Sequence, residues 1–209
     1  MHSAVDAILS KIRPKITAIL RTRAHYDAAE LINQFKIHIW GLMEAHSGDI
    51  FHACVSLLQK LDHVQRRILH ELHMNEESAF MEFNFAPPSL RRNIAVLGLL
   101  HKCSLGKCHP SFDQFLPLLS SRSDQSLGSG HNKQLYGHWD VISSHRALYN
   151  RSIFAMVDIY NGLPQDIINC NSVTAFQKAL TRIVRRRCEG GCAGWASTFT
   201  RQCMGSGMD

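Results

Sequence analysis

Four side chains of the types that bind zinc lie within nine residues of one another: His101, Cys103, Cys108 and His109. Zinc prefers four nitrogen or sulfur ligands in a tetrahedron, usually supplied as two close pairs. We expect Cys103 in the last turn of a helix and Cys108 beyond Gly106, which is not the spacing of a standard zinc knuckle. These residues are therefore interpreted as core or surface side chains.

A second group of cysteines lies near the end of the chain, at Cys188, Cys192 and Cys203. No histidine follows Cys188, so a closed tetrahedral site would need a distant fourth ligand. We predict neither a metal ion nor any other cofactor, and a zinc-stabilised tail remains the alternative.

The sequence lacks the common short patterns of catalysis. It has no Gly-x-Ser-x-Gly elbow and no Gly-x-x-x-x-Gly-Lys-Ser/Thr phosphate loop. No two aspartates are adjacent, and Glu76-Glu77 is interpreted as solvated charge at a helix start. We therefore expect no complete catalytic site in this chain.

Arginine clusters are the remaining chemical signal. Arg66-Arg67, Arg91-Arg92 and Arg185-Arg186-Arg187 each fall on a predicted helix. On one surface they could bind a phosphate backbone, with an affinity that falls as salt rises. They could equally be solvated faces, or partners of helix C-terminal dipoles.

Apolar periodicity predicts that helices carry these residues. A first helix is expected over 3–21, with Pro14 kinking or splitting it. Asp27-Ala-Ala-Glu30 has the form of a capping box and starts a second helix. A third helix is expected over 49–72.

Further helices are predicted toward the end of the chain. Pro87-Pro88 opens one that Gly106 ends, because proline suits a first turn and glycine a C-terminal cap. Another is expected over 144–163, and Ser172 caps a last helix that ends in the arginine run.

We predict a mainly α fold: a helical, thumb-like bundle with a mobile Ser/Gly loop and an irregular Cys/Gly-rich tail. The bundle is expected over 1–119 and a flexible loop over 120–131, where serine and glycine dominate. A C-terminal helical segment over 132–187 would pack on the bundle, and 188–209 would form the tail.

Charge and cysteine usage bound the setting of the protein. The 209 residues carry a formal net charge of +6 with a pI near 9.1, which favours anionic partners such as nucleic acid. No apolar run approaches the roughly 20 residues of a membrane span. Without a secretory signal, the seven cysteines are interpreted as reduced thiols in an intracellular protein, nuclear or cytoplasmic.

Several stretches resemble the C-terminal part of reverse transcriptases from non-LTR (LINE- or jockey-like) retrotransposons. Residues 61–67 are similar to that family's L-D-x-V-Q-R-R helix, and residues 90–100 to its R-R-x-x-x-x-L-x-L-L helix. Residues 151–164 resemble F-x-x-x-x-x-x-x-W-N-x-L-P, with Tyr160 in place of the tryptophan. Residues 172–180 resemble the closing S-x-x-x-F-K-x-x-L helix.

The resemblance extends over roughly residues 5–187 and implies the thumb side of an RNA-directed DNA polymerase, where helices grip the template–primer duplex. The family's catalytic aromatic-x-Asp-Asp motif, which holds two metal ions, has no counterpart here. We therefore expect a non-catalytic fragment that begins downstream of the palm. Basic helix faces would contact an RNA–DNA or DNA duplex through these residues: Lys60, Arg66, Arg67, Arg91, Arg92, Arg182, Arg185 and Arg186.

Two other interpretations remain open. The chain could be a helical protein-interaction module that self-associates through the apolar surface a missing palm would uncover. It could also be the remnant of a decayed mobile element without a selected function.

Overall fold

The computed structural model of the chain describes residues 2–45, 47–119, 131–137 and 145–200. They belong to two units, residues 1–92 (unit 1) and 93–209 (unit 2). The mainly α fold is confirmed. In the described part no strand forms, and the only pairing of extended backbone found is an isolated bridge between Leu118 and Leu135.

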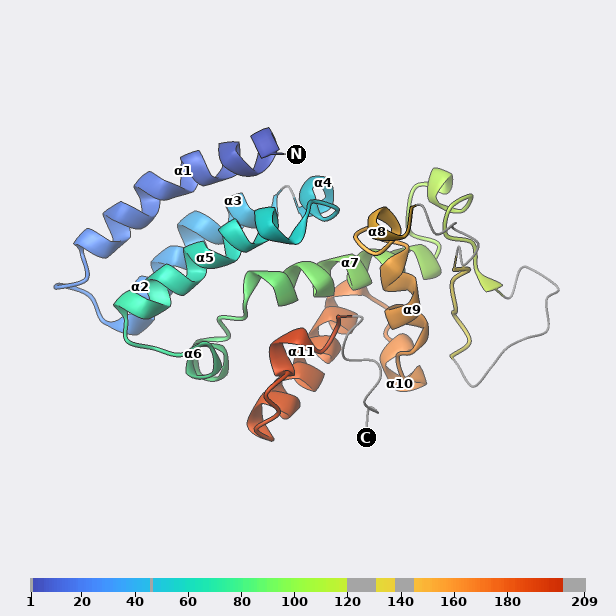
Figure 1. The fold of residues 1–209 in the computed structure, drawn as a ribbon. Helices are drawn as coiled ribbons and strands as arrows, with labels where there is room; N and C mark the ends of the chain where they lie inside the picture. The colour runs from blue at the N-terminus through green and yellow to red at the C-terminus, as the bar shows by residue number, and fades with distance from the viewer. Residues whose placement is uncertain (1, 46, 120–130, 138–144, 201–209) are drawn as a thin grey trace. The chain divides into compact units, whose positions relative to one another are not determined.

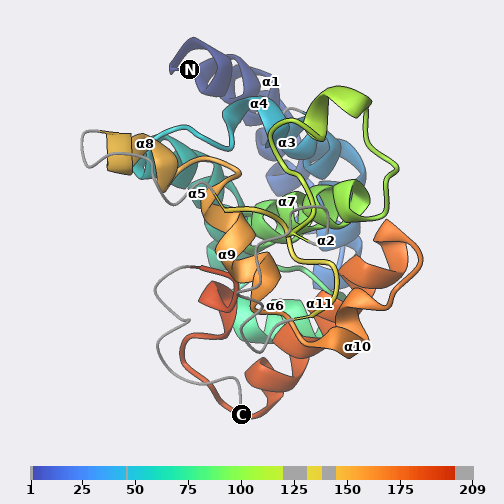
Figure 2. The same ribbon diagram turned by 90° about the vertical axis from the view of Figure 1, so that its right-hand side faces the viewer.

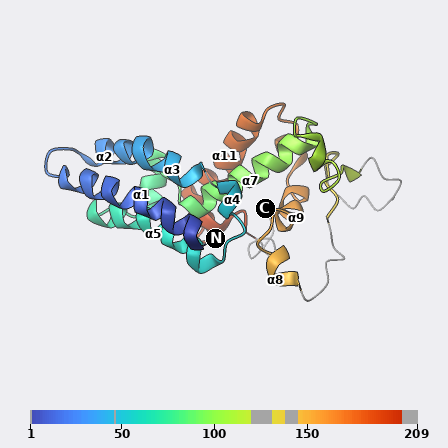
Figure 3. The same ribbon diagram turned by 90° about the horizontal axis from the view of Figure 1, so that it is seen from above.

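Unit 1 is built from helices that lie side by side. Figures 1 and 3 show α1 beside the α2–α3 segment and α5, and their apolar faces form one core that includes Ile12, Phe35 and Leu61. The elements are α1 (His2–Arg21), α2 (Ala28–Phe35), η1 (Lys36–Trp40), α3 (Gly41–Glu44), α4 (Ser47–Ile50), α5 (Val55–Glu71), α6 (Glu76–Phe83) and the start of α7 (Pro88–Ser104).

Local signals set several of these boundaries. The Asp27 carboxylate accepts from the Glu30 N–H and the Glu30 carboxylate accepts from the Asp27 N–H, so the predicted capping box is confirmed. Helix α1 is not split at Pro14 but continues through it. Pro14 is exposed, so the backbone carbonyl that loses its helical partner can reach water.

The helix predicted over 49–72 starts later than expected. A short α4 turn comes first, and Cys54 then takes an extended conformation (φ −65°, ψ 151°) immediately before α5. The break separates the apolar residues of α4 from those of α5, which the helical periodicity of the sequence had placed on one continuous helix. The predicted α7, in contrast, opens at Pro88 as expected.

Trp40 links η1 to the start of α7. Its ring stacks on Phe85 with centroids 5.4 Å apart, and the Arg91 guanidinium lies 3.5 Å from the centroid of the Trp40 ring. Such cation–π contacts stabilise by about 0.5–2 kcal/mol. Segment η1 is a turn of π-helix, which has more residues per turn than an α-helix. It therefore changes the direction in which side chains point between α2 and α3, and Trp40 lies at its end.

Unit 2 contains the rest of α7 and the helices that follow it. Helix α10 lies beside α11 in Figure 2, and η5 also packs on α11. The elements are η2 (Pro110–Phe112), α8 (Arg146–Tyr149), α9 (Ala155–Asn161), α10 (Gln165–Ile168), α11 (Val173–Glu189) and η5 (Trp195–Ser197).

Two predicted features of unit 2 differ from the structure. The helix expected over 144–163 is interrupted between α8 and α9, where the Ser152 hydroxyl donates to the Tyr149 carbonyl (2.7 Å) and replaces a helical bond. Helix α11 reaches Glu189, so regular structure extends into the predicted tail. The Ser172 cap is confirmed, since its side chain accepts from the Ala175 N–H.

Some expectations fall outside the described residues. These include nearly all of the loop predicted over 120–131 and the end of the tail, with Cys203. Of the helices in the described part, none is both long and apolar enough to cross a membrane.

A buried polar network lies inside unit 2. His101 is fully buried, and its Nε2 lies 2.8 Å from the Cys170 carbonyl oxygen. A carbonyl only accepts, so Nε2 carries the proton and Nδ1 accepts from the Tyr160 hydroxyl at 3.1 Å. The Ser104 hydroxyl lies 2.7 Å from that of Tyr160. The imidazole ring also stacks on Phe176, with centroids 4.1 Å apart.

His131 contributes a second buried imidazole to the same unit. Its Nδ1 accepts from the Lys133 N–H at 3.1 Å, so Nε2 donates to the Tyr160 carbonyl at 3.0 Å. Burial is the main reason that the pKa of both His101 and His131 lies below the ordinary value of 6.5. Both rings are therefore neutral at pH 7.

These pKa shifts predict that the protein loses stability in mild acid. The unfolded chain takes up protons below about pH 6.5, before the buried rings do, so the free energy of unfolding falls as pH drops from 7.5 to 5. Urea unfolding at several pH values would measure this fall. The fall should be smaller in His101→Asn than in wild type. Equal pH dependence in the two proteins would contradict a buried, neutral His101.

Candidate nucleic-acid interface

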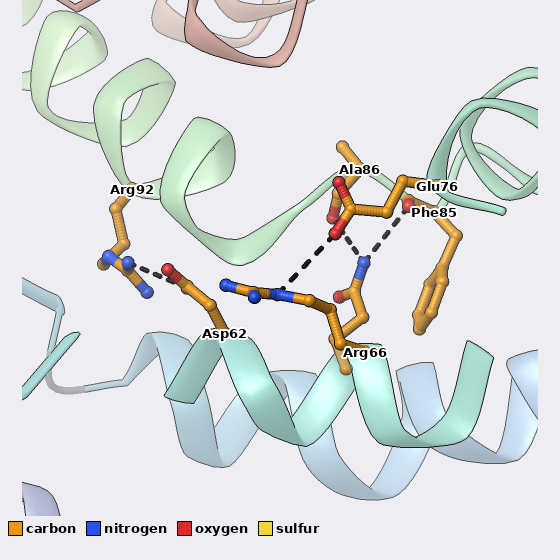
Figure 4. Close-up of polar contacts among 7 residues, drawn as sticks. Asp62, Arg66, Glu76, Phe85, Ala86 and Arg92 are labelled. Atoms are coloured by element: carbon orange, nitrogen blue, oxygen red, sulfur yellow. Dashed lines mark hydrogen bonds and ion pairs between the residues drawn. The ribbon is translucent and has the colours of Figure 1, made fainter. Parts of the chain in front are cut away.

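Arg92, one of the predicted phosphate contacts, is buried in unit 1. Its Nη2 lies 2.9 Å from Oδ1 of Asp62 on α5, and the two side chains are only 7% and 13% exposed (Figure 4). A buried charge needs a partner, because desolvation costs several kcal/mol per ion. Arg92 therefore ties the start of α7 to α5.

Arg66 lies one turn further along α5 and faces α6. Its Nε is 3.9 Å from a Glu76 carboxylate oxygen, and both side chains are roughly half exposed (Figure 4). The neighbouring Gln65 is buried, and its amide donates to the backbone carbonyls of Phe85 and Ala86 at 3.2 and 3.0 Å. These contacts tie the chain between α6 and α7 to α5.

Two more predicted contacts in unit 1 also meet carboxylates. Lys60 Nζ lies 3.4 Å from an Asp6 carboxylate oxygen, and Arg91 pairs with Glu44 while it covers the Trp40 ring. Arg67 is exposed on α5. Four of the five predicted residues of unit 1 are thus engaged by acidic side chains, which would compete with phosphate.

Helix α11 presents a different arrangement. Lys178, Arg182 and Arg186 are all exposed and lie four residues apart, so they share one face of the helix, the α11 basic face. No ion pair joins these three side chains to an acid in the described part of the chain. Arg185 is half-buried. Lys178 was not predicted as a contact, although its spacing from Arg182 could have revealed it.

The charge of the chain is concentrated in the same unit. Residues 93–209 contain 12 lysines and arginines against seven acids, whereas residues 1–92 contain 11 against 10. Unit 2 therefore carries nearly all of the net charge of +6. An anion at its surface would meet an excess of positive charge that local carboxylates do not cancel.

Helix α1 carries cations that were also missing from the predicted interface. Lys11, Arg13, Lys15 and Arg21 are exposed, while its apolar side chains are buried. The sequence shows these residues between the apolar positions of the helix, which is the signal that could have identified them.

The two histidines weighed as zinc ligands in the sequence have other partners. Both His101 nitrogens are hydrogen-bonded inside unit 2, and His109 Nδ1 accepts from the Ser111 N–H. Across the described residues, no group of three or more His, Cys, Asp or Glu side chains is placed to hold a metal ion.

The two arginines of Figure 4 should differ in their importance for stability. Arg92→Met leaves Asp62 charged and buried, which should lower the free energy of unfolding by about 3–5 kcal/mol. Arg66→Met removes an exposed pair and should lower it by less than about 1 kcal/mol. Urea denaturation measures both, and equal losses would show that the Arg92–Asp62 pair is not buried in solution.

No protein-family model matches the sequence, and searches of curated proteins and of solved structures return no match.

Proposed function

We propose that the chain binds a nucleic-acid duplex non-specifically, through phosphate contacts made by the α11 basic face. The observation that supports this most is the placement of Lys178, Arg182 and Arg186, exposed on one side of a helix with no acid paired to them in the described chain. The chain would act as a non-catalytic, thumb-side fragment related to retrotransposon reverse transcriptases.

The spacing of the α11 basic face suits a phosphate backbone. Residues four apart on a helix are separated by about 6 Å along its axis, so the three cations span about 12 Å. Phosphates of one DNA strand follow at about 3.4 Å along the duplex axis. Three side chains with long, flexible stems can therefore reach separate phosphates on one strand.

Helix dipoles alone do not account for these residues. Arg186 lies in the last turn of α11, where a cation offsets the negative end of the helix. Lys178 and Arg182 lie further from that end, and the dipole effect falls off within the last turn. The three cations would act together, each contacting a phosphate of the same strand.

The resemblance to reverse transcriptases supports the choice of a duplex as the ligand. Residues 172–180, which resemble that family's closing helix, form the first half of α11 and include Lys178. A thumb helix that grips the backbone needs cations but reads no bases. We therefore expect binding with little sequence preference.

Neutralising the α11 basic face should weaken duplex binding and reduce its salt dependence. In the variant Lys178→Gln/Arg182→Gln/Arg186→Gln, the slope of log affinity against log salt should be less steep by roughly 0.9 per lost contact. Fluorescence anisotropy with labelled DNA and RNA–DNA duplexes, over a salt series starting at about 50 mM, measures this slope.

A matched control separates local contacts from net charge. The variant Arg23→Gln/Lys60→Gln/Arg66→Gln removes the same charge from exposed residues of unit 1 that pair with acids. Its affinity and slope should stay close to those of wild type. If the control variant weakens binding as much as the α11 variant does, duplex affinity depends on net charge alone and not on the α11 basic face. No binding by wild type at low salt would reject the function itself.

A second candidate function is protein interaction, favoured by a groove on unit 1. Two hollows of about 310 and 270 Å³ follow one another between α1 and the α2–α3 segment. Together they are called the α1 groove. Their walls carry methyl and aliphatic groups with cations, and none of the described lining residues is acidic. The lining includes Ala4, Ala7, Ile8, Lys11, Lys15, Ala18, Ile19, His38 and Leu42.

The α1 groove would suit an amphipathic partner helix with acidic flanks, since its wall is apolar and it carries Lys11 and Lys15. A designed Leu/Glu helical peptide should bind, and Lys11→Glu/Lys15→Glu should raise its Kd roughly tenfold, or about 1.4 kcal/mol. Arg13→Glu/Arg21→Glu, on α1 but outside the lining, is the charge-matched control. Anisotropy measures both. Equal binding of a Leu/Lys peptide would contradict this candidate.

A further inference from the structure

Two cysteines meet at the C-terminal end of α7. The Sγ atoms of Cys103 and Cys108 lie 2.8 Å apart, although five residues separate them in the sequence. Cys103 is buried, whereas Cys108 is partly exposed. A disulfide bond needs its sulfurs about 2.05 Å apart, so a movement of less than about 1 Å would close one here.

The turn between them is fixed by backbone hydrogen bonds. The Gly106 N–H donates to the Cys103 carbonyl at 2.9 Å, and the Lys107 N–H donates to the Lys102 carbonyl at 3.1 Å. This pair of bonds is the Schellman motif, with Gly106 in the left-handed region at φ +65°. The motif reverses the chain directly after the helix and returns Cys108 to Cys103.

We propose that Cys103 and Cys108 are a redox modification site that closes reversibly to an intramolecular disulfide. The oxidant would be a small disulfide such as glutathione disulfide. Neither cysteine is used in the proposed contact with nucleic acid, so this site is independent of that function.

The two thiols would react in a fixed order. Burial raises the pKa of the Cys103 thiol to about 12, and its contact with Cys108 adds to the rise, so Cys103 is a poor first nucleophile. Cys108 is the more accessible of the two. It therefore attacks the oxidant first, and Cys103 resolves the mixed disulfide.

Two thiol–disulfide exchange steps would form the bond. Cys108 gives up its proton, its sulfur bonds to one sulfur of glutathione disulfide, and one glutathione thiolate leaves. Cys103 then gives up its proton and attacks Cys108 Sγ, and the second glutathione thiolate leaves. The protein loses two electrons and two protons, and glutathione disulfide becomes two molecules of reduced glutathione.

Closure would tie the last turn of α7 to the following loop. Ser104, the next residue after Cys103, contacts the Tyr160 hydroxyl, and His101 is hydrogen-bonded to the same hydroxyl. The disulfide would therefore restrain the helix end that carries the buried network of unit 2. Oxidation should raise the thermal unfolding temperature of the full chain.

Peptide mapping tests the site directly. Trypsin cuts after Lys102 and Lys107, so Cys103 and Cys108 fall in separate peptides, 103–107 and 108–122. After incubation in glutathione disulfide and alkylation of free thiols, mass spectrometry should find these two peptides joined, with two hydrogens lost. Reduced glutathione should separate them again.

Variants distinguish this site from random oxidation. Cys103→Ala should keep glutathione attached to Cys108, because the resolving thiol is gone, and Cys108→Ala should leave Cys103 unmodified. Gly106→Ala should shift the equilibrium with glutathione toward the dithiol. Alanine disfavours the positive φ of this turn, and nothing lies within 4 Å of the added methyl group, so the effect would come from the backbone alone. Gly191→Ala, at φ +70° and equally open, is the matched control.

Three results would overturn the proposal. One is the absence of joined peptides in glutathione disulfide while the protein keeps its helical circular dichroism. Another is a stable glutathione adduct on Cys108 of the wild-type protein. The third is an equal shift of the dithiol equilibrium in Gly106→Ala and Gly191→Ala.

Discussion

The buried ion pair between Arg92 and Asp62 constrains what unit 1 can do with its charge. Both side chains lie in the interface between α5 and the start of α7, so each needs the other to offset the cost of desolvation. Around them, Glu44 and Glu76 hold Arg91 and Arg66. The arginines of α5 and α7 thereby connect the elements of unit 1. The charge that no carboxylate balances is concentrated in unit 2, where α11 presents three cations on one exposed face.

The two units differ in their interior polar groups. Unit 1 encloses the Arg92–Asp62 ion pair beside the buried amide of Gln65, whereas in unit 2 His101, Ser104 and Tyr160 are hydrogen-bonded to one another and to backbone. Protonation of His101 would break the bond that its Nδ1 accepts from Tyr160, so we expect mild acid to destabilise unit 2. The same helix end carries Cys103 and Cys108, so acid and oxidation would act on one region of the structure.

Local features of the fold could be predicted from the sequence, because a few neighbouring residues determine them. The capping box at Asp27, the Ser172 cap and the opening of α7 at Pro88 are all of this kind. The interruption between α8 and α9 was missed, since apolar periodicity continues through it. Ion pairing was also missed, because Arg92 and Asp62 are 30 residues apart and periodicity does not reveal which acid meets which base. The sequence therefore could not show that the cations of α5 lie beside carboxylates, whereas Lys178 could have been found from its spacing of four residues from Arg182.

Lysine acetylation in the presence and absence of a duplex tests whether α11, and not α5, offers the phosphate-binding charge. Lys178 and Lys60 are both exposed, so each should react readily in the free protein. Mass spectrometry of the acetylated peptides compares their rates. We expect the duplex to slow acetylation of Lys178 and to leave that of Lys60 unchanged. Protection of Lys60 with no change at Lys178 would contradict it.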